Sequence, residues 1–193
     1  MLGLKLATDP RWVNIVEKDI AEILTDHAWC EQKAASTAIS LTVHFPERTE
    51  LVNAMIDLAR EELLHFKMVM DKLTERGLTL GRERKDDYVN DLMRFVRKGG
   101  DRNLNLMDKL LLSAMIEARS CERFRLLSEN ISDDDLKSFY RELMESEAGH
   151  YKLFIGFARK YSDRKLVDKR WDEFLDYEAE VVSKYGKAVG MHG

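Results

Sequence analysis

Two short segments of the same form decide the fold: residues 62–65 read Glu-Leu-Leu-His, and residues 147–150 read Glu-Ala-Gly-His. Side chains three positions apart lie on the same face of a helix, so each segment presents a carboxylate beside an imidazole. Each segment also lies within a run whose apolar residues recur with the period of an amphipathic helix. Both segments are therefore predicted to be helical, with Glu and His on the apolar, inward face.

A further glutamate precedes each segment at nearly the same distance. Glu62 follows Glu31 by 31 residues, and Glu147 follows Glu117 by 30 residues. A predicted turn lies about midway in each interval, so at ~1.5 Å per residue the two glutamates of each helical hairpin stand at the same height. Two such hairpins packed together would bring four carboxylates and the imidazoles of His65 and His150 into one layer.

The apolar spacing and the positions of proline and glycine predict an all-α protein. Pro46 and residues 130–133 mark turns, and Gly99 with Gly100 breaks the chain before the third long helix. The expected helices span residues 11–45 (with Asp9 and Pro10 at its start), 49–75, 83–98, 104–129, about 133–161 and about 166–186. Four long helices in two hairpins, joined by a long connection, are typical of a four-helix bundle with one crossover and extra helices. We expect one domain over residues 1–193.

Composition narrows the function classes. The chain has 193 residues, of which 45% are hydrophobic and 34% charged, with only 2 prolines, so it is globular and poor in turn residues. A net charge of −4 argues against nucleic-acid binding by bulk charge, although a local basic face stays open. Two cysteines are too few for a disulfide scaffold or a cysteine metal site. No apolar run approaches the ~18 residues of a membrane span, and we identify no signal peptide, so we expect a cytoplasmic protein without membrane contact.

The layer of acidic side chains predicts a metal centre. Burying four carboxylates without a cation is very costly, so the layer is expected to bind metal. Its predicted ligands are Glu31, Glu62, His65, Glu117, Glu147 and His150. A carboxylate-rich set with two histidines suits iron or manganese better than zinc. One Glu from each of two helices and Glu-x-x-His from the other two form the di-iron or di-manganese motif of ferritin-like bundles.

Neighbouring residues leave alternatives open. Glu122 is an alternative to Glu117, although it lies away from the apolar stripe and breaks the symmetry of the hairpins. Glu61 points off the stripe and is either solvated or an acid supporting a ligand. His27 is a hydrogen-bonded core histidine or a support for Glu31 on the same helical face.

Four further residues near the ligands have a structural and a functional interpretation. Asp26 is a candidate for orienting a ligand histidine. Tyr151 is a core tyrosine or a redox residue. Cys30 and Cys121 are expected to be buried and to pack as small apolar side chains.

Three segments carry a resemblance to a known family. They are residues 27–36 (HAWCEQKAAS), 117–124 (EARSCERF) and 147–151 (EAGHY). They resemble signatures of the tRNA 2-methylthio-N6-isopentenyladenosine hydroxylase family, and the likeness runs over about residues 5–185. The resemblance implies a ferritin-like non-haem di-iron monooxygenase that uses O₂ to hydroxylate the isopentenyl group of a modified adenosine beside the tRNA anticodon. It also implies that the six residues named above are the iron ligands.

The resemblance implies tRNA and an electron donor as partners. The sequence has no flavin or pyridine-nucleotide motif, so an external reductase or electron carrier is expected. Basic residues cluster at positions 82–85, 94–102 and 159–170. They are interpreted either as solvated charge interleaved with acids or as a surface for tRNA phosphates.

Other ferritin-like proteins stay open as alternatives. An iron-storage cage needs assembly surfaces, which fit the basic clusters and the long crossover less well. A peroxidase of the rubrerythrin type commonly carries a Cys-x-x-Cys iron domain, and this sequence has no Cys-x-x-Cys. The ligands alone do not exclude a manganese catalase.

Overall fold

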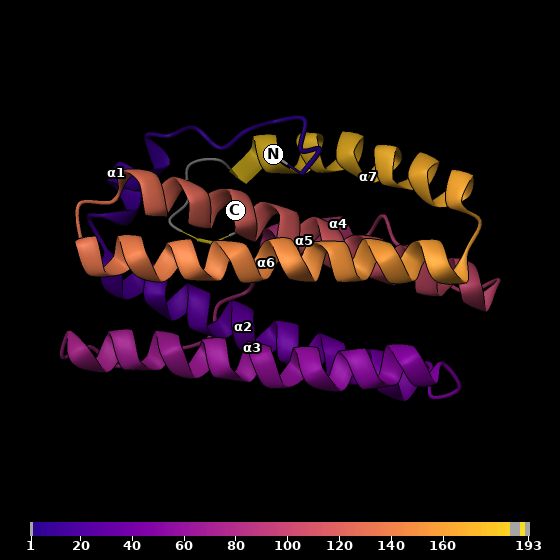
Figure 1. Ribbon diagram of the computed structural model, residues 1–193. Coiled ribbons are helices and arrows are strands. Elements are labelled where there is room, and N and C mark those ends of the chain that lie inside the picture. Colours follow the sequence, from indigo (N-terminus) through magenta and orange to yellow (C-terminus); the bar gives the residue numbers. More distant parts are fainter. Residues whose placement is uncertain (1, 186–189, 192–193) are drawn as a thin grey trace. The chain divides into compact units, whose positions relative to one another are not determined.

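The computed structural model describes residues 2–185 and 190–191, and this part of the chain contains seven helices and no strand (Figure 1). The helices are α1 (Trp12–Val16), α2 (Ile20–His44), α3 (Thr49–Glu75), α4 (Asp87–Met93), α5 (Arg102–Asn130), α6 (Asp134–Tyr161) and α7 (Arg164–Tyr185). The described residues fall into two compact units. The α2–α3 unit contains residues 18–85 and 190–191, and the α5–α7 unit contains residues 2–17 and 86–185. The predicted all-α character is confirmed.

The α2–α3 unit is an antiparallel helical hairpin. Its first helix begins at Asp19, whose side chain accepts a hydrogen bond from the backbone N–H of Glu22 at 3.0 Å. Helix α2 ends at His44, one residue before Phe45 and Pro46, because the residue before a proline is pushed out of helical geometry. The apolar residues buried along α2 and α3 include Ile23, Leu24, Leu41, Leu51, Met55 and Leu73.

Helix α5 is the centre of the α5–α7 unit and packs against α1, α4, α6 and α7. Its N-terminus is capped by Asp101, which accepts from the backbone N–H groups of Asn103 and Leu104. Asp133 caps α6 in the same way, as one of the two predicted caps. Because α5 is covered by several helices, its buried residues lie on all sides and not on a single stripe.

A buried ionic network ties the N-terminal segment to α5 and α7. The Arg119 guanidinium lies 2.6 Å from a carboxylate oxygen of Glu178 and 2.8 Å from one of Glu122, and all three residues are buried. Glu122 also accepts from the backbone N–H of Thr8 at 2.8 Å, and Glu178 accepts from the hydroxyl of Tyr88 at 2.9 Å. These contacts satisfy polar groups that would be costly to bury alone.

Two predicted elements differ from the structure. The helix expected over residues 11–45 is wrong as one element, because α1 ends at Val16 and α2 begins at Ile20. The break has two causes: the side chain of Glu17 accepts a hydrogen bond from Ser132 N–H at 2.7 Å, and Asp19 adopts an extended cap conformation. Asp9 precedes α1 by a turn and accepts from Arg11 N–H.

The connecting helix expected over residues 83–98 is shorter than predicted. It is α4, which spans only residues 87–93 and is capped by the side chain of Asp86 at Val89 N–H. Helices α5 and α7 each begin two residues earlier than expected, and residue 186 lies outside the described residues. Within the described part, no helix is both long and apolar enough to span a membrane.

Candidate metal centre

The α2–α3 unit brings three of the predicted ligands together. Glu31 comes from α2, and Glu62 and His65 come from α3. One potential ligand atom of each lies within 4.8 Å of the others, and the three residues are 1–5% exposed. His65 Nδ1 lies 3.6 Å from Glu31 Oε2 and 3.4 Å from Glu62 Oε2. The predicted helical register therefore places both carboxylates and the imidazole at one level of the hairpin.

The two carboxylates strongly favour a cation at the position of His65. Burial by itself lowers the pKa of this imidazole, but hydrogen bonds and the charges of Glu31 and Glu62 outweigh that effect and raise the pKa to about 10. In the absence of a metal ion, a proton on His65 therefore neutralises part of the charge of the two acids. A metal ion would take over this role, and His65 would then bind it as neutral imidazole.

Residues beside this triad support it in different ways. His27 is fully buried, and its Nε2 lies 2.6 Å from Glu31 Oε1, so it holds the carboxylate from one turn earlier on α2. Glu61 Oε1 lies 3.9 Å from His65 Nε2, and its side chain is half exposed. Asp26 does not orient a ligand histidine among the described residues, because its carboxylate accepts from the backbone N–H of Met191 at 2.6 Å.

The α5–α7 unit assembles a second triad of the same composition. Glu117 comes from α5, and Glu147 and His150 come from α6. His150 Nδ1 lies 3.8 Å from Glu147 Oε2, and potential ligand atoms of His150 and Glu117 lie within 4.8 Å of each other. All three residues are at most 6% exposed. Ser146 Oγ lies 3.4 Å from His150 Nε2, a neighbour that the sequence did not indicate.

The structure separates Glu122 from Glu117 by function. Glu122 forms hydrogen bonds with Thr8 and an ion pair with Arg119, so its carboxylate is engaged in the buried ionic network. Glu117, one and a half turns earlier on α5, lies with His150. No sequence signal linked Glu122 to Thr8, because 114 residues separate them.

Cys121, Cys30 and Tyr151 have the environments of packed side chains. Cys121 is buried and donates to the backbone carbonyl of Met144; burial, followed by the charge of Glu147, raises its pKa to about 11. Cys30 is only half buried, so the expectation of a buried residue is wrong for it. Tyr151 is half buried and its ring centroid lies 5.7 Å from that of Trp171. Burial raises the pKa of its hydroxyl, which stays protonated at neutral pH.

Each unit thus provides two buried carboxylates and one imidazole. These are hard oxygen and nitrogen donors of the kind that iron and manganese accept. The donor sets fit such an ion on an observation of this structure: in the α2–α3 unit the acids already hold the pKa of His65 well above its ordinary value.

Comparison with known families identifies the chain. The family model described as tRNA-(MS[2]IO[6]A)-hydroxylase (MiaE) matches residues 2–193. The chain belongs to the MiaE family. The family resemblance seen in the three sequence segments is thereby confirmed.

Individual relatives agree with the family assignment of this MiaE-family chain. A tRNA 2-(methylsulfanyl)-N(6)-isopentenyladenosine(37) hydroxylase from Pseudomonas putida is 40% identical over 185 residues, covering 96% of this chain and 89% of that protein. A protein of the same name from Salmonella typhimurium is 34% identical over 147 residues, covering 76% of this chain and 53% of its own length.

A solved structure supports the fold class. The Synechococcus protein 43 with aldehyde deformylating oxygenase activity is 33% identical to this MiaE-family chain, with a TM-score of 0.92 over 98% of this chain and 95% of that one. The predicted all-α, ferritin-like fold class is confirmed. The same comparison adds an oxygenase as a structural neighbour.

Proposed function

We propose that this chain is a tRNA-modifying non-haem di-iron monooxygenase. In this proposal it hydroxylates the isopentenyl group of (2-methylthio-)N6-isopentenyladenosine next to the anticodon. The observation that carries the proposal is the pair of buried triads of equal composition in a chain whose family model matches residues 2–193. The names of the Pseudomonas and Salmonella relatives supply the substrate class.

The proposed metal centre uses both triads. Two iron ions would be held, within one domain formed by both units, by Glu31, Glu62, His65, Glu117, Glu147 and His150. When bound and reduced by an external electron donor, iron supplies the activation of O₂ for insertion into a C–H bond. Manganese fits the same donors, and the choice of iron rests on the oxygenase relatives.

The protein's own residues have three tasks in this scheme. His27 positions the carboxylate of Glu31 through their 2.6 Å contact. The six ligands are each at most 6% exposed, so bulk water is kept from the donor atoms. The thiol of Cys121 stays protonated at neutral pH and therefore does not compete as a thiolate ligand.

A second candidate function is favoured by one observation. The Synechococcus structure is named for aldehyde deformylating oxygenase activity and matches over 98% of this chain. The tRNA hydroxylase proposal has more support, because the Pseudomonas protein is more identical to this chain, at 40% against 33%. A long-chain aldehyde assayed under the same conditions separates the two functions, and we expect no conversion of it.

The test of the proposed function is mass spectrometry of nucleosides. Prenylated tRNA is incubated with the iron-loaded protein, a chemical reductant and O₂, and its nucleosides are then analysed. We expect a gain of one oxygen atom on the prenylated adenosine, lost in Glu62→Ala and retained in the neighbouring Glu61→Ala. No gain with several prenylated tRNAs would contradict the proposal.

A further inference from the structure

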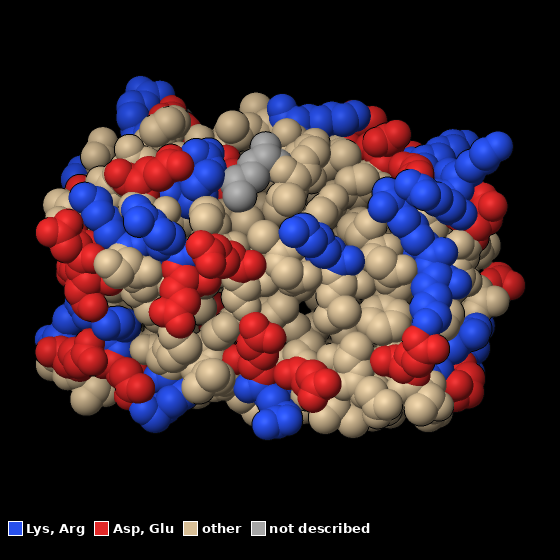
Figure 2. All heavy atoms as spheres, viewed as in Figure 1, with Lys and Arg blue, Asp and Glu red and all other residues tan. Residues whose placement is uncertain are grey.

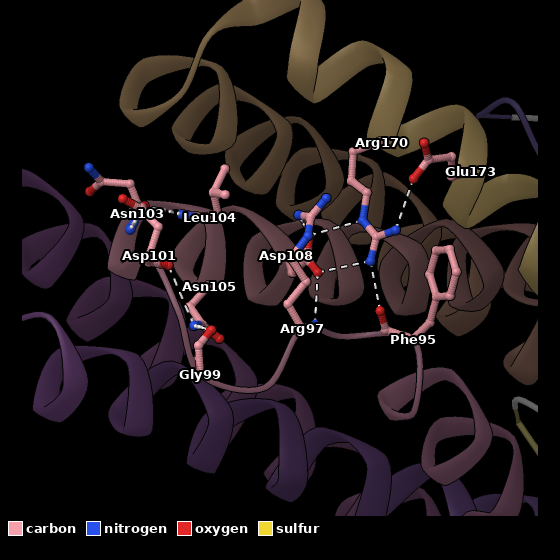
Figure 3. A network of polar contacts seen from close by, with 10 residues as sticks. All are labelled: Phe95, Arg97, Gly99, Asp101, Asn103, Leu104, Asn105, Asp108, Arg170 and Glu173. Carbon is pink, nitrogen blue, oxygen red and sulfur yellow. Dashed lines mark hydrogen bonds and ion pairs between the residues drawn. The ribbon is translucent and has the colours of Figure 1, made fainter.

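Two basic segments that lie far apart in the sequence are joined by a single buried acid. Asp108 is fully buried on α5, and its Oδ1 lies 2.7 Å from an Arg97 guanidinium nitrogen and accepts from Arg170 Nε at 3.0 Å (Figure 3). Its Oδ2 accepts from the backbone N–H of Arg97 at 2.9 Å. Arg170 also donates to the backbone carbonyl of Phe95 at 2.7 Å. Residues 95–97 are therefore fixed against α5 and α7.

The same contact sets the relative height of the helices. Asp108 lies six residues after Arg102, the first residue of α5, and Arg170 lies six residues after Arg164, the first residue of α7. At 1.5 Å per residue, both helices begin about 9 Å from the shared contact. Helix α6 ends at Tyr161, only two residues before α7 begins. The start of α5, the end of α6 and the start of α7 thus form one end of the unit.

This end of the α5–α7 unit is strongly basic. Residues 94–109 and 159–173 together contain eleven Lys and Arg and six Asp and Glu, a net charge of +5 in a chain whose net charge is −4. We name the exposed cations there the α6–α7 basic face: Lys98, Arg102, Lys160, Arg164, Lys165 and Lys169. Figure 2 shows Lys and Arg gathered at the right-hand end of the viewed face, where α6 leads into α7 in Figure 1.

The acids at this end leave several of these cations unneutralised. Asp108 is shared by Arg97 and Arg170 in the interior, and Asp168 pairs with Arg159 at 2.7 Å. Asp101 and Asp163 cap the N-termini of α5 and α7 through their side chains. Within the described residues, Lys98, Lys165 and Lys169 are exposed and contact no acid.

Aromatic side chains lie among these cations. Phe157 and Tyr161 at the end of α6 stack with ring centroids 5.9 Å apart and an interplanar angle of 12°, and both are half buried. Basic side chains interleaved with accessible aromatic rings are typical of surfaces that bind single-stranded RNA, because phosphates pair with the cations and bases stack on the rings. An acidic protein partner would need the cations alone, so the aromatic pair favours RNA.

We propose that the α6–α7 basic face binds the phosphates of the tRNA substrate, an inference that rests on the proposed function. His150 lies ten residues before Lys160 on α6, so the face lies about 15 Å along the helix axis from this ligand. Phosphates and the reacting base would therefore bind at different places on the same unit. The basic residues on 94–102 and on 159–170 act as one surface because Asp108 holds them together.

The test compares charge reversals that cannot disturb a buried contact. The test variant is Lys98→Glu with Lys165→Glu and Lys169→Glu. The control is Lys137→Glu with Arg141→Glu, which has the same one-turn spacing as Lys165 and Lys169 but lies in the first half of α6, toward its other end. Binding of an unmodified tRNA transcript is measured at several salt concentrations, and circular dichroism checks that each variant is folded.

We expect the triple variant to bind at least tenfold more weakly, with the slope of log K against log salt smaller by about 2, because each lost phosphate contact removes about 0.9. Lys98→Glu alone and Lys165→Glu with Lys169→Glu should each weaken binding, and the control should not. Unchanged tRNA binding by the triple variant would overturn the proposal. So would unchanged tRNA binding together with slower turnover with an acidic electron-transfer protein, which would assign the face to that partner.

The failure of this inference differs from the failure of the proposed function. If the wild-type protein hydroxylates prenylated tRNA but the triple variant binds as tightly as wild type, only the inference is wrong. If the wild-type protein binds transcripts through the basic face but adds no oxygen, only the proposed function is wrong.

Discussion

Arg119 carries its charge in the interior of the α5–α7 unit, where it pairs with Glu178 and Glu122. Those carboxylates raise the pKa of its guanidinium against the effect of burial, so it stays charged at any pH at which the protein is folded. Removing one partner of such a pair leaves the others buried without compensation. The network is therefore a requirement for the position of α7 and of the N-terminal segment on α5.

We predict that Arg119→Met lowers the free energy of unfolding by about 3–5 kcal/mol. Arg125→Met on the same helix is the control, because Arg125 and Glu129 form an exposed pair 2.8 Å apart and such pairs contribute at most about 1 kcal/mol. Urea denaturation followed by circular dichroism measures both. Equal effects of the two substitutions would show that the buried network does not stabilise the unit.

A second prediction concerns the two thiols. Cys121 is buried and its pKa is raised to about 11, so at pH 8 almost none of it is thiolate, whereas Cys30 is partly exposed. We expect iodoacetamide at pH 8 to modify Cys30 first in the folded protein, and both cysteines in urea. Peptide mass spectrometry locates the adducts, and early modification of Cys121 would contradict the environment described here.

The ligand residues were more predictable than their surroundings. Glu-x-x-His has a fixed spacing on one helix, so local periodicity is enough to place Glu62 with His65 and Glu147 with His150. The partners of Glu122 and Asp26 lie more than 100 residues away in the sequence, at Thr8 and Met191. Contacts of that kind depend on tertiary packing, which helical periodicity does not determine.

At the scale of the elements, the loop between α4 and α5 is held by one side chain. Asp108 accepts four hydrogen bonds, two from Arg97 and two from Arg170. Gly99 and Gly100 in this loop have φ values of +75° and +79°, which only glycine adopts without strain. The loop therefore combines a flexible pair of residues with one fixed attachment.

We predict that Asp108→Asn increases hydrogen exchange at the backbone amides of residues 95–101, because the neutral amide cannot accept from both guanidinium groups. Asp168→Asn is the control, since it removes an exposed pair with Arg159 elsewhere at the same end. Hydrogen exchange followed by mass spectrometry compares the two variants. Faster exchange at residues 95–101 in the control as well would argue against a specific role of Asp108.

Helix boundaries were predicted where caps are local and missed where they are not. Asp133 before α6 and Pro46 after α2 are signals contained in a few residues, and both boundaries follow them. The break between α1 and α2 depends on the contact of Glu17 with Ser132, 115 residues away, so the apolar period continued through it in the sequence.

At the scale of the whole molecule, the fold class followed from the near-repetition of two hairpins. The equal intervals between Glu31 and Glu62 and between Glu117 and Glu147 predicted two equivalent halves, and each hairpin has a buried triad of two carboxylates and one imidazole. The substrate was not contained in that repetition, because any ferritin-like metal protein shares it. The substrate class comes from the family and its named relatives.

The iron content of the purified, iron-loaded protein tests the central claim most directly. Elemental analysis of the wild-type protein should give two iron ions per chain. Alanine at any one of the six ligands should lower that number, and His65→Ala and His150→Ala should do so alike, whereas Glu61→Ala and Glu122→Gln should keep two. A wild-type protein that binds no iron, or a full pair of ions in the Glu31→Ala or Glu117→Ala variant, would contradict the account.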